Sequence, residues 1–188
     1  ASDVYKRQAL AGPYYNMGII LKRNGRVEEA IDSYKKAISL RSDYVQAYNN
    51  LGVLYKDHEE YENAIKMFMK ATELQPDHQN SYYNLGLIKK EQGSSEEAID
   101  LFLKVLDINP EHTEAKFNIS LLRKDEGSLE EAKRHLQEIL ISDQKYENAA
   151  KELAIVFGEM GNFKSAISSL IKLISDIPKN RSLFHGLG

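Results

Sequence analysis

The sequence predicts an all-α fold made of tandem helix–turn–helix repeats. Residues of the same type recur every 34 residues over most of the chain, a period that fits two short helices and a turn. The first half of each repeat carries a large apolar residue followed by a small one. The second half carries an alanine and, four positions later, another large apolar residue. Glycines or prolines stand where most of these helices should end.

The period divides the chain into five repeats, which occupy residues 11–44, 45–78, 79–112, 113–146 and 147–180. The first helices carry the pairs Met17-Gly18, Leu51-Gly52, Leu85-Gly86, Ile119-Ser120 and Leu153-Ala154. The second helices carry Ala30, Ala64, Ala98, Ala132 and Ala166, followed by Tyr34, Phe68, Phe102, Leu136 and Leu170. A glycine inside a helix costs about 1 kcal/mol relative to alanine. We therefore expect a close approach of the second helix at this glycine, with the alanine at the crossing.

Residues at the predicted helix ends support this division. Gly25, Gly93, Gly127 and Gly161 follow four first helices, where a left-handed residue commonly ends a helix. Glu59 takes the place of this glycine in the second repeat, so we expect strain in that turn. Ser94-x-x-Glu97 and Ser128-x-x-Glu131 predict capping boxes at the start of two second helices. Pro76, Pro110 and Pro178 are expected to stop three second helices.

The two ends of the chain depart from the repeats. Asp3 and Lys6 would stand where later repeats have apolar residues, so residues 1–10 do not fit the register. The string at 2–8 resembles the translated end of a sequencing adapter, and we expect residues 1–10 to be a non-native leader. Residues 181–188 place Phe184 at the aromatic position and Gly188 at the small position. They predict the start of a truncated sixth repeat.

Composition and motifs exclude several classes of function. The net charge of −3 lacks the basic character of a nucleic-acid binder. The chain has no cysteine, which excludes disulfides and thiolate metal sites, and no apolar stretch long enough for membrane insertion. Phosphate-binding glycine loops, nucleophile elbows and zinc-protease motifs are also absent. We therefore predict no catalytic, cofactor-binding or metal-ligating residues, and the compartment stays open.

The apolar–small pairs, the recurring alanines and the closing prolines resemble the tetratricopeptide repeat family over about 170 residues. The resemblance implies a right-handed superhelical solenoid of antiparallel helix pairs. It also implies that the first helices line a concave groove and the second helices form the outer face. Repeats four and five depart from the family pattern at the aromatic and small positions, with Lys116, Ser120, Ala150 and Ala154.

A row of asparagines on the first helices is the candidate binding site. Asn16, Asn50, Asn84 and Asn118 recur one period apart, and Glu152 interrupts the row in the fifth repeat. Asparagine offers both a donor and an acceptor, so it can hold the backbone of an extended peptide. Tyr15, Tyr83 and Phe117 are the predicted flanking contacts, and the same set of positions includes Asn49. The row resembles the asparagine ladder in the superhelical arm of O-linked N-acetylglucosamine transferase.

The predicted function is a protein–protein interaction scaffold that binds an extended peptide in this groove. Two alternatives stay open: a substrate-recruiting region of a larger enzyme such as a glycosyltransferase, and a self-associating scaffold. The last second helix carries Ile167, Leu170, Ile171 and Ile174, which would let the C-terminal end associate with another copy. Acidic residues and lysines near the ends of the first helices form two further rows. They indicate either solvated helix ends or a ligand of mixed charge.

Overall fold

The structure, a computed structural model, describes residues 2–144 and 146–176. Within these residues it contains ten helices and no strand: α1 (Ser2–Arg23), α2 (Val27–Leu40), α3 (Val45–Asp57), α4 (Tyr61–Leu74), α5 (Gln79–Glu91), α6 (Ser95–Ile108), α7 (Thr113–Asp125), α8 (Leu129–Ser142), α9 (Glu147–Glu159) and α10 (Phe163–Asp176). The predicted all-α fold is confirmed. The expected leader is helical from Ser2 onward, whereas Pro178 and the expected sixth repeat lie outside the described residues.

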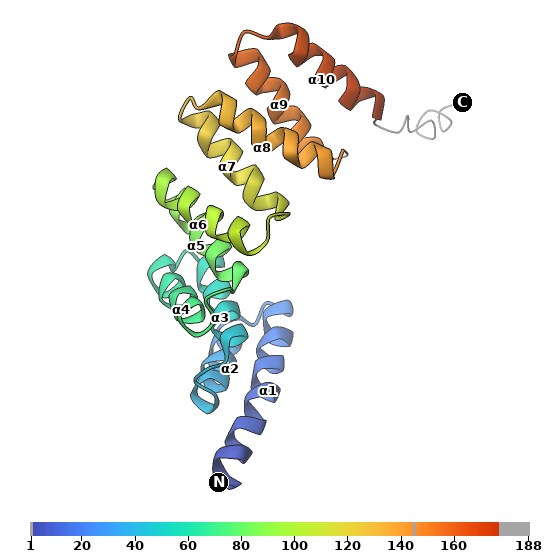
Figure 1. Ribbon diagram of the computed structural model, residues 1–188. Helices are drawn as coiled ribbons and strands as arrows, with labels where there is room; N and C mark the ends of the chain where they lie inside the picture. Colours follow the sequence, from blue (N-terminus) through green and yellow to red (C-terminus); the bar gives the residue numbers. More distant parts are fainter. Residues whose placement is uncertain (1, 145, 177–188) are drawn as a thin grey trace, which may run out of the picture. The chain divides into compact units, whose positions relative to one another are not determined.

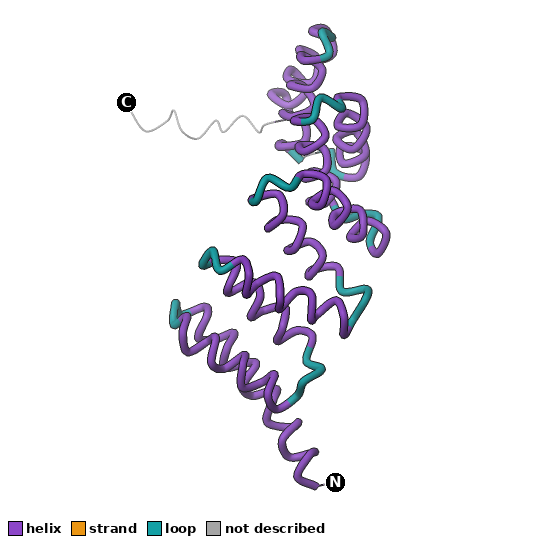
Figure 2. Tube along the Cα trace, turned by 90° about the vertical axis from the view of Figure 1, so that its left-hand side faces the viewer, coloured by secondary structure: helices purple, strands orange, loops and turns teal. Residues whose placement is uncertain are grey.

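The helices form two compact units, residues 1–110 with α1 to α6 and residues 111–188 with α7 to α10. Each odd-numbered helix packs against the helix that follows it, as Figure 1 and Figure 2 show. Neighbouring helix pairs also pack on each other: α2 contacts α3 and α4 contacts α5 in the first unit, and α8 contacts α9 in the second. The helices α3, α5, α7 and α9 begin at residues 45, 79, 113 and 147, one period apart.

Left-handed residues end the first helices. Gly25, Gly93, Gly127 and Gly161 have φ of 72°, 75°, 81° and 74°, as their positions predicted. Glu59 occupies the corresponding position after α3 with φ of 61° and is the one non-glycine residue with positive φ in the described part of the chain. A side chain at such a φ brings Cβ close to the following carbonyl oxygen. The predicted strain in this turn is therefore present.

Replacing Glu59 with glycine should relieve this strain. Glu59 is exposed and has φ of 61°, so the change removes the Cβ clash without opening a cavity. We expect Glu59→Gly to raise the free energy of unfolding by about 0.5–1 kcal/mol, measured by urea denaturation. Gly93→Ala, the opposite change at the equivalent turn, should lower it by a similar amount. Equal stability of Glu59→Gly and the wild type would contradict this account.

The predicted capping boxes do not form, although Ser94 and Ser128 do occupy the N-cap positions of α6 and α8. Neither serine side chain makes a capping hydrogen bond, and their ψ values are 71° and 61°. The two glutamates turn toward cations of the preceding helix instead. Glu97 lies 2.7 Å from Lys89 Nζ, and Glu131 lies 3.1 Å from Arg123 Nε. The competing ion pair explains why the reciprocal hydrogen bond to the N-cap backbone is missing.

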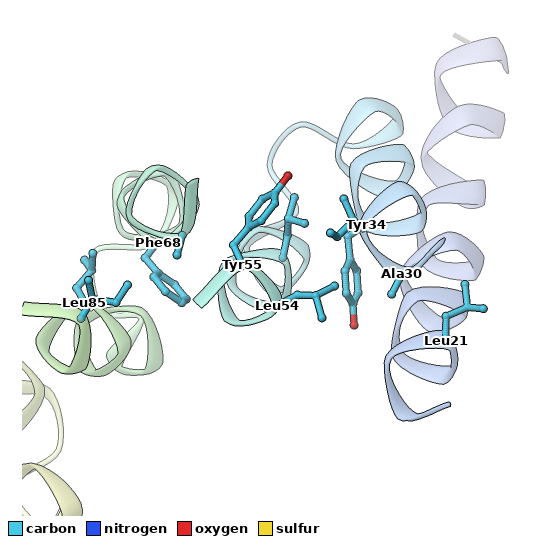
Figure 3. Packing of buried hydrophobic residues seen from close by; sticks show 11 residues of the cluster. Leu21, Ala30, Tyr34, Leu54, Tyr55, Phe68 and Leu85 are labelled. Carbon is cyan, nitrogen blue, oxygen red and sulfur yellow. The ribbon is translucent and has the colours of Figure 1, made fainter. Parts of the chain in front are cut away.

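The core of the first unit explains its helix glycines. Tyr34 and Phe68 belong to one buried cluster that runs from α1 to α5, seen in Figure 3. A Cβ added at Gly18 would lie 2.6 Å from the Tyr34 ring, and one at Gly52 would lie 2.8 Å from the Phe68 ring. Gly86 has the same relation to Phe102, at 2.7 Å. The ring, rather than the alanine that we expected at the crossing, is therefore what each glycine accommodates.

The looser repeats obey the same rule with smaller partners. Where the second helix carries Leu136 or Leu170 in place of an aromatic ring, the first helix carries Ser120 or Ala154 in place of glycine. Leu136 is 1% exposed, so the pair in the fourth repeat is still buried. A leucine occupies less room than a phenyl ring at this crossing. The departures in repeats four and five thus change which side chains pack at the crossing, but the two helices of each repeat still pack together.

Candidate functional site

The predicted asparagine row lies on equivalent positions of the first helices, but its members differ in exposure. In the first unit, Asn16 on α1 is exposed, whereas Asn50 on α3 and Asn84 on α5 are half-buried. In the second unit, Asn118 on α7 is buried, with 8% of its surface exposed. The side chains of this row therefore do not offer a uniform set of free amides. Asn16 and Asn84 are the members that solvent reaches most readily within the first unit.

Asn50 is held by a tyrosine of the first repeat. Its Nδ2 donates a hydrogen bond to the Tyr15 hydroxyl oxygen at 3.1 Å, which joins α3 to α1. Tyr34, which is only 1% exposed, lies near the same amide. Burial raises the pKa of both tyrosine hydroxyls. A neighbouring tyrosine adds to each rise, Tyr44 for Tyr15 and Tyr15 for Tyr34, and the Asn50 amide opposes it. The amide of Asn50 thus satisfies the Tyr15 hydroxyl, which is a role in the fold.

A chain of polar side chains extends from Asn50 to α5. The Nδ2 of Asn49 lies 3.5 Å from Asn50 Oδ1, and Ser81 Oγ donates to Asn49 Oδ1 at 3.2 Å. His78 Nδ1 lies 2.9 Å from the same Ser81 oxygen, and burial lowers the pKa of His78. The repeat pattern pointed to Asn49 but not to His78 and Ser81. Ser81, fully buried, stands where α3, α7 and α9 have alanine, and that exchange was the available signal.

Asn84 and Asn118 are oriented by their own helices. Each Nδ2 donates to the backbone carbonyl oxygen one turn earlier, of Asn80 and Glu114 respectively, and both distances are 2.8 Å. An amide has two N–H groups and one carbonyl oxygen, so this bond leaves Asn84 with a donor and an acceptor for another partner. The Asn84 side chain is therefore held in one orientation by its own helix. Asn118 is buried and makes further contacts, so it is less accessible.

The predicted aromatic neighbours are half-buried and pack against rings of their own unit. The Tyr15 ring centroid lies 4.9 Å from that of Tyr44 and 6.0 Å from that of Tyr34. Tyr83 lies 5.6 Å from Phe102 on α6, and in the second unit Phe117 lies 5.7 Å from Tyr146. These rings stabilise the repeats, and only their exposed parts can contact a ligand.

Two lysines of the charged rows pair with acidic residues of the following first helix. In the first unit, Lys22 Nζ of α1 lies 3.2 Å from Asp57 Oδ2 of α3. In the second unit, Lys124 of α7 lies 2.7 Å from Glu152 of α9, and both side chains are largely buried. The hydrogen bond with Glu152 raises the pKa of Lys124. Glu152, which interrupts the asparagine row, therefore pairs with a cation of the preceding repeat.

In the described part of the chain, no group of three or more His, Asp or Glu side chains is arranged to hold a metal ion. His78 and His112, one period apart, are the N-cap residues of α5 and α7, and His112 Nδ1 accepts the Ala115 N–H at 3.2 Å. None of the described helices combines the length and the apolar character that crossing a membrane requires.

Comparison with known proteins identifies the repeats. Residues 18–59 match a family model for the TPR repeat, and residues 43–111 match a model for the tetratricopeptide repeat. The two matches together span residues 18–111, half of the chain. No curated protein sequence matches the chain.

Solved structures of similar fold cover most of the chain. MamA from Desulfovibrio magneticus RS-1 has a TM-score of 0.79 at 19% identity, over 88% of this chain and 93% of that one. PilF from Pseudomonas aeruginosa has a TM-score of 0.77 at 20% identity, over 90% and 78%. YrrB, described as a TPR protein with an unusual peptide-binding site, has a TM-score of 0.73 at 26% identity, over 89% and 87%.

Proposed function

Since the chain belongs to the tetratricopeptide repeat family, a fold that serves as a protein–protein interaction scaffold, we propose that it binds an extended peptide along its first helices. In the first unit the binding face is formed by α1, α3 and α5, with Asn16 and Asn84 as backbone-binding residues. Asn50 holds this face in shape through Tyr15. In the second unit, Asn118 and the exposed part of Phe117 occupy the equivalent positions on α7.

The orientation of Asn84 carries this proposal. Its Nδ2 is held by the Asn80 carbonyl oxygen, so the remaining N–H and the Oδ1 are presented together on a half-buried face. A peptide group needs one acceptor and one donor of this kind. Packed helices lie roughly 8–10 Å apart and an extended peptide rises about 3.3 Å per residue. Asparagines on successive first helices would therefore meet the peptide backbone at about every third residue.

A structural relative supports the ligand class. YrrB, which shares 26% identity with this chain, is described as having a peptide-binding site. The charges of the face agree with a ligand held mainly through its backbone. Lys22 is paired with Asp57 in the first unit, and Lys124 with Glu152 in the second, so neither lysine is an unpaired anchor for an acidic peptide.

The test is the affinity of a peptide selected from a random displayed library against the whole chain. Replacing Asn16 and Asn84 with alanine should weaken binding about tenfold, because each lost hydrogen bond contributes about 0.5–1.5 kcal/mol. Neither side chain is buried, so the melting temperature should change little. Fluorescence anisotropy with the labelled peptide measures the affinity, and circular dichroism measures the melting temperature.

The design avoids Asn50, whose loss would remove its hydrogen bond to the Tyr15 hydroxyl between α3 and α1 and lower stability. Asn63→Ala is the matched control, because Asn63 is an exposed asparagine on α4 that hydrogen-bonds to Glu60. The control should bind like the wild type. If the variant lacking Asn16 and Asn84 also bound like the wild type, the peptide would not lie on this face.

A further inference from the structure

A small pocket lies between the first two repeats, where α3 packs against α2 and α4. It has a volume of about 250 Å³, and its walls include Lys35 and Ile38 of α2, Tyr48, Leu51 and Tyr55 of α3, and Met67 of α4. None of the asparagines of the candidate site lines it. Since α1 packs on α2 and α5 packs on α4, all of its walls come from helices inside the first unit that have neighbours on both sides.

The interior of this pocket is apolar. Leu51 and Tyr55 are buried, and Ile38 and Met67 are half-buried. Lys35 is exposed, so the pocket opens to solvent on the side of this lysine. A closed apolar cavity of about 150 Å³ can hold a benzene molecule. The pocket is larger than this, so it has room for one phenylalanine side chain.

A positive charge without a counter-charge stands at the edge of the pocket. The Nζ of Lys35 lies 5.9 Å from the centroid of the Tyr55 ring, and Lys35 makes no ion pair with any described residue. Its ammonium group keeps three N–H donors for another partner. The Tyr55 hydroxyl points away from Phe68, as Figure 3 shows. Because none of the described residues that line the pocket is acidic, the charge favours an anionic group in the ligand.

The corresponding positions of the next repeat lack this combination. Met69 of α4 stands in place of Lys35, and Lys89 of α5 stands in place of Tyr55. The Nζ of Lys89 is already paired, at 2.7 Å from Glu97. Repeats therefore pack together without an unpaired lysine and a tyrosine at these two positions. The packing of the helices does not by itself explain why the first junction carries them.

We propose that this pocket binds a segment of a partner protein in which a phenylalanine stands next to an aspartate or glutamate. The phenyl ring enters the space between Ile38, Leu51 and Met67, and the neighbouring carboxylate pairs with the Nζ of Lys35. This contact is separate from the peptide-binding face proposed above, because neither Asn16 nor Asn84 lines the pocket.

The experiment is NMR spectroscopy of the whole chain with ¹³C-labelled methionine methyl groups, and the probe is N-acetyl-Phe-Glu-amide. Met67 lines the pocket, whereas Met69, on the same helix, is 59% exposed and lies outside it. Added probe should shift the Met67 methyl signal in a saturable manner and leave the Met69 signal in place. N-acetyl-Phe-Gln-amide, which carries no charge, should bind about threefold more weakly, because the ion pair with Lys35 is lost.

Substitutions on α2 test the role of the charge. Lys35→Gln should bind the two probes with equal affinity. Lys36→Gln is the matched control, because Lys36 is exposed on the same helix but does not line the pocket, and it should keep the threefold preference. Both lysines are exposed, so the variants should keep the helical circular dichroism of the wild type.

The result is independent of the face on the first helices. The variant lacking Asn16 and Asn84 should bind the charged probe like the wild type, and loss of its binding would place the probe on that face instead. The proposal would be overturned by an unmoved Met67 signal at millimolar probe. Equal affinity of the wild type for the two probes, or a preference that survives in Lys35→Gln, would also overturn it.

Discussion

Replacing Gly52 with alanine is expected to lower the free energy of unfolding by about 1–2 kcal/mol, although alanine is the better helix former. The new Cβ would lie 2.8 to 3.0 Å from three carbon atoms of the Phe68 ring. Phe68 is fully buried, so the ring cannot move away without disturbing the core. Urea denaturation followed by circular dichroism measures the change. Gly12→Ala is the control: Gly12 also lies inside a helix, but no atom lies within 4 Å of its added Cβ, so stability should rise.

A second substitution should offset this loss. The fifth repeat combines Ala154 with Leu170, so Gly52→Ala together with Phe68→Leu reproduces a pair that the chain already uses. Leucine removes the ring atoms that the new Cβ would meet. The double variant should lose less free energy of unfolding than the sum of the losses of the two single variants, by at least about 1 kcal/mol. Additive changes would show that the ring and the glycine are not coupled, and would contradict the explanation of the helix glycines.

Replacing His135 with leucine is expected to raise the free energy of unfolding by about 1–3 kcal/mol at pH 7.5. His135 on α8 is 8% exposed, and its Nδ1 has no hydrogen-bond partner among the described residues. The equivalent residues in the first unit are Ser33, Met67 and Leu101, so an apolar side chain occupies this position in two of its three repeats. Gln137→Leu is the control, because Gln137 is exposed on the same helix and its replacement removes no buried nitrogen. If His135→Leu did not raise the free energy of unfolding, the buried Nδ1 would not be the destabilising group that we infer.

The same histidine should make stability depend on pH. Burial lowers the pKa of His135 below 6.5 and the charge of Arg134 lowers it further, while Glu138 and Glu131 oppose the shift. The unfolded chain then binds the proton more tightly than the folded chain. Above pH 6.5, His135 is neutral in both states and does not reduce the free energy of unfolding. As the pH falls through 6.5 toward the folded-state pKa, the unfolded chain takes up the proton first and the free energy of unfolding decreases. Denaturation between pH 7.5 and 5.5 should therefore show a smaller loss of stability for His135→Leu than for the wild type.

Much of the fold followed from local patterns. The period predicted helix pairs because each repeat of a solenoid contacts only its neighbours, so equivalent residues meet equivalent surroundings. The turn glycines were predictable because a left-handed residue after a helix is a local requirement. Glu59 adopts the same positive φ although it is not a glycine. Less could be predicted about the candidate site. The row of asparagines was visible, but not that Tyr15 engages Asn50, since this depends on which hydroxyl lies within reach.

The sequence by itself determined that this chain folds as helix pairs with a period of 34 residues, and which residue types lie inside each pair. Only the tertiary structure decided between competing partners. Gly52 faces the Phe68 ring, and Glu97 pairs with Lys89 instead of the N-cap backbone. Asn50 bonds to Tyr15 of another repeat, whereas Asn84 bonds to a carbonyl oxygen of its own helix. The reason is physical: helix formation follows local spacing, whereas a polar side chain bonds to the nearest suitable group, which can lie in another repeat.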